Sequence, residues 1–70
     1  MNIAEIISKN FGSGFISVDT KKEFMNLLKS QTVGTFLETK KDKVRLTIWK
    51  NKAGNIIGIS TKTEFFVRHY

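Results

Sequence analysis

The chain contains no cysteine, no proline and a single histidine, His69, next to the C-terminal residue. Without cysteine there are neither disulfide bonds nor thiolate metal sites. One histidine has no second histidine or cysteine to join it in a zinc site, a Cys–His pair or a Ser–His–Asp triad. We therefore interpret His69 as a polar surface residue and expect no metal and no cofactor.

The remaining chemistry-bearing residues are also sparse. Asp19 and Glu23 are explained by helix capping, and only a Glu38–Glu64 pair meeting across a sheet would bring two carboxylates together. The "GSG" stretch at residues 12–14 lacks the lysine and the spacing of a phosphate-binding loop. The sequence therefore predicts a protein that is not an enzyme.

Long hydrophobic runs are missing as well. No apolar run approaches the roughly 18 residues that span a membrane, and "MNIAEIISKNFG" lacks the pattern of a signal peptide. We expect a cytoplasmic protein that does not bind membranes. The richness in Lys, Asn, Ile and Phe is typical of an AT-rich coding sequence, such as a phage often carries.

The length of 70 residues predicts one small domain. A domain of this size buries only about 60% of the surface of its unfolded chain, so its stability is modest. With 40% hydrophobic residues and no disulfide, the chain has to build its core alone or share it with a second subunit. Homodimer formation is therefore left open.

Positive charge is concentrated in the last fifty residues. Residues 1–20 carry one cation and two carboxylates, whereas residues 21–70 carry eleven cations and four carboxylates. Within residues 40–52, six cations accompany only Asp42. Such a field attracts anions, and nucleic acid is the commonest polyanionic partner. A solvated lysine-rich surface that only keeps the protein soluble is the alternative.

Helical patterns occupy the first half of the chain. Apolar spacing predicts a helix over about residues 2–10, with Gly12 after its end. Thr20 and Glu23 match a capping box, which predicts a second helix from there to about Gln31. The "FISV" stretch between the two helices is either a short strand or an extended connection.

From Val33 onward the hydrophobic period changes to two, which is typical of strands. Strands are predicted over residues 35–40 and 43–50, and a third begins near Asn55. Sixteen extended residues would span about 50 Å, whereas a domain of this length has a radius of gyration of about 11 Å. The third segment is therefore expected to bend or break near Lys62. The predicted fold is α+β: two N-terminal helices followed by a three- or four-stranded antiparallel meander.

Turn chemistry and the apolar pattern together predict the strand register. The first turn is placed at Lys41-Asp42 and the second loop at residues 51–54; a loop with a bulge at Gly54, setting Val44 against Lys62, ranks second. The predicted pairs are Leu37–Leu46, Thr39–Val44 and Glu38–Arg45 in the first hairpin, and Ile48–Ile57 and Leu46–Ile59 in the second. Both hairpins then place their apolar residues on one sheet face.

The other sheet face combines aromatic and basic side chains. It is predicted to carry Phe36, Trp49 and Ile56 beside Lys40, Lys43, Arg45 and Lys62, with Gly58 leaving room for a flat ligand. Unpaired bases stack on such rings while cations hold the phosphates. The competing interpretation is that a helix covers this face and Trp49 is core. The candidate nucleic-acid-binding residues are Phe36, Lys40, Lys41, Lys43, Arg45, Trp49, Lys50, Lys52 and Lys62.

Two functional hypotheses follow. The first is a small basic protein that binds RNA or single-stranded DNA on this face; duplex binding through Lys21, Lys22 and Lys29 is a variant. The second is an inhibitor or adaptor, such as a phage protein directed against a host defence, that binds a host protein through the same Trp and Arg residues. An edge strand at residues 35–40 or 65–70 could also pair with a partner or with a second copy.

Overall fold

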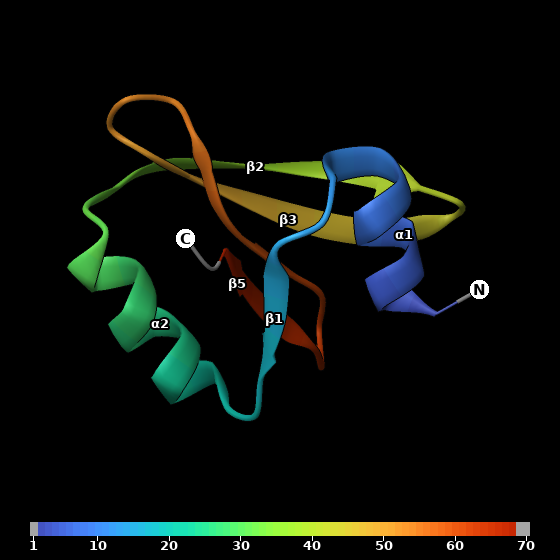
Figure 1. Ribbon diagram of the computed structural model, residues 1–70, viewed down its shortest axis with the longest axis horizontal. Coiled ribbons are helices and arrows are strands. Elements are labelled where there is room, and N and C mark those ends of the chain that lie inside the picture. The colour runs from blue at the N-terminus through green and yellow to red at the C-terminus, as the bar shows by residue number, and fades with distance from the viewer. Residues whose placement is uncertain (1, 69–70) are drawn as a thin grey trace.

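The computed structural model describes residues 2–68, and His69 and the end of the 65–70 strand prediction lie outside them. Two helices and five strands follow one another along the chain (Figure 1). The elements are α1 (Ile3–Phe11), β1 (Phe15–Val18), α2 (Lys21–Ser30), β2 (Val33–Lys41), β3 (Val44–Asn51), β4 (Ile56–Ser60) and β5 (Phe65–Arg68). The predicted α+β class is confirmed.

Both helices begin at the residues that the sequence indicates. The side chain of Asn2 accepts a hydrogen bond from the Glu5 amide at 2.8 Å, and Thr20 accepts one from the Glu23 amide at 3.2 Å. These bonds satisfy amides that have no partner within the first helical turn. No helix among residues 2–68 is both long and apolar enough to cross a membrane.

The sheet has the strand order β1-β5-β4-β3-β2, and all neighbours are antiparallel. Strands β2 to β5 form the predicted meander, and the third segment breaks at Lys62, as expected. Here the Thr61 amide donates to the Glu64 carbonyl oxygen at 2.8 Å. The predicted three or four strands fall short of the five observed, because "FISV", for which a short strand was one of two alternatives, forms β1 and pairs with β5. Strand β5 is therefore internal rather than the predicted edge.

The β2–β3 turn lies one residue later than predicted. Asp42 and Lys43 occupy its centre with φ of 50° and 68°, which is the left-handed pair of a type I′ turn. Leu37 therefore pairs with Ile48, and the predicted Leu37–Leu46 pairing is wrong by two residues. The inward and outward faces are preserved, because side chains repeat every two residues along a strand.

The second hairpin differs from the prediction in the same way and also contains a bulge. Ile48 pairs with Ile59 rather than with Ile57, and the register shifts between the Trp49 and Lys50 pairs. The extra residue on β4 turns Ile56 toward the α1 face, where it packs against the core. Its predicted place beside Trp49 is therefore wrong.

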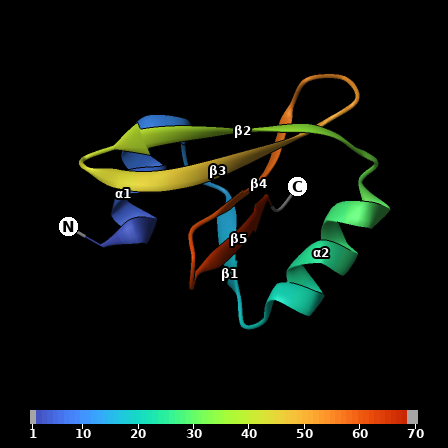
Figure 2. The same ribbon diagram turned by 180° about the vertical axis from the view of Figure 1, so that it is seen from behind.

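The sheet is covered by one helix on each face, so the domain has three layers (Figure 2). Two buried clusters result. The α1 cluster contains Ile6, Ile7, Leu46, Ile48, Ile59 and Phe66. The α2 cluster contains Val18, Phe24, Leu28, Ile57 and Val67. The competing interpretation, in which a helix covers the second face, is thus confirmed in part.

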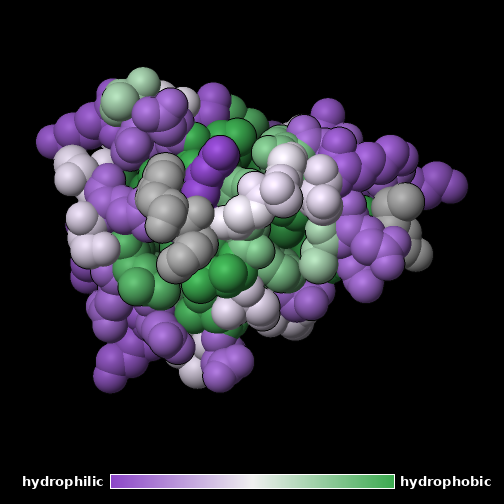
Figure 3. Space-filling model, viewed as in Figure 1, coloured by the Kyte–Doolittle hydropathy of each residue, from purple (hydrophilic) through white to green (hydrophobic). Residues whose placement is uncertain are grey.

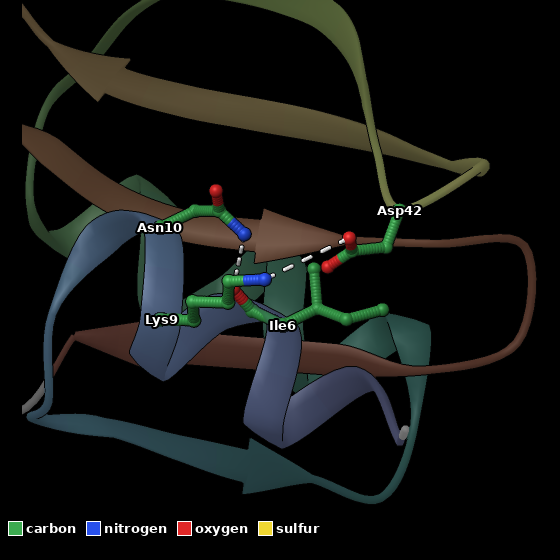
Figure 4. A network of polar contacts seen from close by, with 4 residues as sticks. All are labelled: Ile6, Lys9, Asn10 and Asp42. Atoms are coloured by element: carbon green, nitrogen blue, oxygen red, sulfur yellow. Dashed lines mark hydrogen bonds and ion pairs between the residues drawn. The ribbon is translucent and has the colours of Figure 1, made fainter.

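Polar contacts at the end of α1 tie this helix to the tip of the β2–β3 hairpin (Figure 4). The Lys9 ammonium lies 3.9 Å from a carboxylate oxygen of Asp42. Within the helix, the side-chain amide of Asn10 donates to the Ile6 carbonyl oxygen at 2.8 Å. Within residues 2–68, Lys9–Asp42 is the one ion pair. Both of its side chains are exposed, so it contributes little to the stability of the fold.

Candidate nucleic-acid interface

Helix α2 covers part of the face that was expected to bind a ligand. A Cβ atom placed on Gly58 would lie 2.8 Å from Leu28 Cδ2 and 3.1 Å from Phe24 Cε1. The missing side chain therefore admits the protein's own helix. The prediction that Gly58 leaves room for a flat ligand is wrong, because Phe24 already occupies that space.

A row of aromatic rings runs from this buried region to the edge of the sheet. Phe24 packs edge-on against Trp49, with ring centroids 6.0 Å apart. Trp49 lies beside Phe36 at 5.0 Å with a 34° tilt. The indole N–H of Trp49 donates to the buried Ser60 hydroxyl at 3.0 Å. Trp49 is thus a fixed, half-buried support, whereas Phe36 is 60% exposed and presents its ring to solvent.

A groove of about 700 Å³ opens beside Trp49, between β3, the β4–β5 turn and the start of α2. Its charged lining comprises the cations Lys21, Lys43, Arg45 and Lys62 and the carboxylates Glu38 and Glu64. Hydroxyl groups are contributed by Thr47, Ser60, Thr61 and Thr63. Cations thus outnumber carboxylates, and hydrogen-bonding groups lie among them, which suits an anionic ligand.

Strand β3 extends past the end of β4 at this groove. The last β3–β4 pair is Thr47 with Ser60, so the two strands are no longer paired at Arg45. The backbone N–H and C=O of Arg45 point to the β4 side, because residues of an antiparallel strand address its two neighbours alternately. The groove therefore offers a backbone donor and acceptor beside the Arg45 guanidinium.

Four of the predicted site residues line the groove together, and two more lie directly beside them. Lys43, Arg45, Trp49 and Lys62 are lining residues. Phe36 pairs with Trp49 and Lys40 pairs with Arg45 across β2 and β3, which places both on the same face. We call these six residues the basic–aromatic surface: Phe36, Lys40, Lys43, Arg45, Trp49 and Lys62.

The other three predicted residues lie elsewhere. Lys41 pairs with Val44 and Lys50 pairs with Ile56, and both partners pack against the α1 cluster, so these lysines are on the opposite face. Lys52 lies in the β3–β4 loop, at the far end of β3 from the hairpin tip. Sequence proximity grouped them with the site, but strand alternation separates Lys41 and Lys50 from it and the loop position separates Lys52.

Within residues 2–68, the positive charges of the basic–aromatic surface are not neutralised by ion pairs. The predicted Glu38–Arg45 pair does not form, because Glu38 lies opposite Thr47. None of the cations on this surface makes an ion pair with a carboxylate among residues 2–68. Hydrophilic residues cover the projecting β2–β3 hairpin at the right of Figure 3, whereas hydrophobic residues gather near the middle of that view.

Sequence reasoning missed the residues that the fold brings to the groove from a distance. Lys21 was assigned only to a duplex-binding variant, and the hydroxyls of Thr47 and Thr61 were not considered. Their contribution depends on how α2 and the β4–β5 turn meet β3, and no local pattern encodes that arrangement. Glu38 and Glu64 do line one groove, but no group of three possible metal ligands occurs within residues 2–68.

Comparison with known proteins adds no assignment. No protein-family model matches the chain, and no curated protein and no solved structure matches it significantly.

Proposed function

We propose that this protein binds RNA or single-stranded DNA on the basic–aromatic surface, without catalysis. One observation carries the proposal: the ring of Phe36 is 60% exposed and lies beside cations that have no carboxylate partner within residues 2–68. Stacking of a base on an exposed ring is worth about 1–3 kcal/mol. The cations supply the attraction for the phosphates that flank such a base.

A single strand fits this surface better than a duplex. The ring of Phe36 can stack only on a base whose face is free, and a duplex hides the faces of its bases within the stack. Helix α2 directs Phe24 and Leu28 into the core rather than forming half of a helix-turn-helix unit. Lys21 is therefore assigned to the rim of the groove rather than to a duplex-binding helix. The proposed setting is the cytoplasm, where a cysteine-free chain needs no oxidising environment.

The stacking contribution is tested by titrating labelled single-stranded oligonucleotides into the protein. Phe36→Ala is expected to weaken binding by about 5- to 150-fold, the equivalent of one lost stacking contact. Ile16→Ala is the matched control, because Ile16 is a similarly exposed hydrophobic residue on the opposite edge strand. If both variants bind equally well, Phe36 does not hold a base.

The contribution of phosphate contacts is tested with variants that replace one cation by a neutral side chain. Arg45→Gln should weaken binding and reduce its dependence on salt, whereas Lys52→Gln, at the far end of β3, should change neither. Absence of binding at low salt in the unmodified protein would reject the proposal. The surface around Trp49 would then be examined as an interface for a host protein, which is the function expected of an inhibitor or adaptor.

A further inference from the structure

The β2 strand is an exposed sheet edge of nine residues without proline. The two-residue turn makes Lys41 and Val44 the hydrogen-bonded pair that closes the hairpin, so alternate residues back to Thr35 bond to β3. The backbone N–H and C=O groups of Phe36, Glu38 and Lys40 consequently point away from β3. No strand lies on that side within residues 2–68.

Exposed hydrophobic side chains flank this open edge on both sheet faces. Phe36 is 60% exposed on the α2 face, and its neighbour Leu37 is 45% exposed on the α1 face. An unpaired strand with apolar groups on both sides is a template for pairing with another strand. Lys40 and Lys41 at the end of the strand and the bulge between Val33 and Thr35 protect this edge in part, so the segment that can pair lies between them.

We propose that β2 pairs antiparallel with β2 of a second copy, centred on Leu37, to form a continuous ten-stranded sheet. Leu37 is the midpoint of the nine-residue strand, and residues 35–39, which follow the bulge between Val33 and Thr35, pair regularly in this register. The two Leu37 side chains then cover one another on the α1 face. Lys40 and Lys41 then lie beside the bulged start of the second copy's strand, at residues 33 and 34, so no cation lies opposite a cation.

Neighbouring registers are less favourable. Centring the pair on Glu38 places the two Glu38 carboxylates directly opposite each other, which is destabilising. Centring it on Thr39 places Leu37 opposite Lys41 of the second copy, so the two Leu37 side chains no longer cover one another. The other sheet edge, β1, has only four residues. These contacts favour β2 and the register centred on Leu37.

The dimer joins the two basic–aromatic surfaces. Two-fold pairing keeps both α2 faces on the same side of the sheet, and it makes the two Phe36 rings diagonal neighbours, within reach of each other. A single strand could then run from one groove across both Phe36 rings to the second groove. This consequence rests on the proposed function, whereas the pairing of β2 does not.

Charge distinguishes dimerisation from nucleic-acid binding. Each copy carries a formal net charge of +6, so the two copies repel one another. Added salt screens this repulsion and should strengthen the dimer, whereas salt weakens binding to phosphates. A bound strand neutralises both copies, so it should also favour the dimer by linkage.

Disulfide trapping tests the register, and the cysteine-free chain makes single-cysteine variants unambiguous. Leu37→Cys should form a disulfide-linked dimer in a glutathione redox buffer, because directly opposed residues lie within bonding range. Thr39→Cys should not, since the two Thr39 positions would be separated by about 13 Å along the strands. Leu27→Cys, at an exposed leucine of α2, reports random collision. Trapping through Thr39→Cys instead of Leu37→Cys would overturn the register.

Sedimentation of the unmodified protein without nucleic acid tests the dimer itself. The dimer should become more populated as salt is raised. Leu37→Lys should raise its dissociation constant about tenfold or more, because it places two cations opposite each other, whereas the same charge change in Leu27→Lys should not. A monomer at all concentrations and salts would overturn the dimer and leave the nucleic-acid proposal standing. A dimer that binds no oligonucleotide would support the pairing and reject the proposed function.

Discussion

Gly58→Ala tests whether α2 packs against the sheet at Gly58 without room for a side chain. The added Cβ would lie 2.8 Å from Leu28 Cδ2 and 3.1 Å from Phe24 Cε1. Both side chains are buried, with 0% and 1% of their surface exposed, so neither can move into solvent. These side chains, or helix α2 that carries them, would have to shift to accommodate one methyl group.

The expected cost follows from two opposing contributions. Overpacking of a well-packed core costs about 1–3 kcal/mol. Alanine restores about 0.5–1 kcal/mol because it loses less backbone entropy on folding than glycine. Gly58→Ala should therefore lower the free energy of unfolding by up to about 2.5 kcal/mol. Leu28→Ala alone should lower it by about 2–5 kcal/mol.

Urea unfolding followed by the fluorescence of Trp49, the one tryptophan, measures both variants and their combination. The double variant should be less destabilised than the sum of the single variants by about 1 kcal/mol or more, because Leu28→Ala makes room for the new methyl group. Strictly additive effects of the two substitutions would refute the tight contact between α2 and the sheet.

Three further variants test separate features of the fold. Ser60→Ala should cost about 1 kcal/mol in urea unfolding, because the Trp49 indole N–H loses its acceptor. Lys43→Gly should raise the unfolding free energy by about 0.5–1 kcal/mol, since Lys43 has a φ of 68° that glycine adopts without strain; the same variant should weaken oligonucleotide binding. Lys9→Ala should change stability by less than about 0.5 kcal/mol, because its contact with Asp42 is 3.9 Å long and exposed.

Local signals in the sequence predicted much of the fold. Apolar spacing marks the first helix, the Thr20 capping residue marks the start of the second, and the switch to a period of two marks the meander. The break near Lys62 followed from size alone, because an unbroken strand would exceed the dimensions of the domain. These features depend on neighbours in the chain, and for that reason sequence reasoning reached them.

The strand register could not be read in the same way. A shift of two residues keeps every side chain on its face, so the apolar pattern that selected Leu46 as the partner of Leu37 serves Ile48 equally well. The position of the turn decides between the two registers. Asp42 and Lys43 adopt left-handed backbone geometry there, although neither is glycine, the residue that usually indicates such a turn. The order of the strands posed a similar problem, since β1 joins the sheet beside the last strand.

The candidate site was predicted in part. The alternation of side chains along β2 and β3 correctly grouped Phe36 and Trp49 with Arg45. It could not reveal that α2 would occupy the space above Gly58, because that contact joins residues thirty positions apart. The consequence is a smaller surface than expected, in which Trp49 supports the exposed Phe36 ring.

The salt dependence of affinity for a labelled single-stranded oligonucleotide tests the central claim most directly. Each phosphate held by a cation contributes a slope of about −0.7 to log K against log salt for a single strand. Contacts from Lys40, Lys43, Arg45 and Lys62 thus predict a slope of about −2.8, or a loss of about 50-fold between 50 and 200 mM salt. A slope near zero, or no binding at the lowest salt, would contradict the assignment of this surface to nucleic acid.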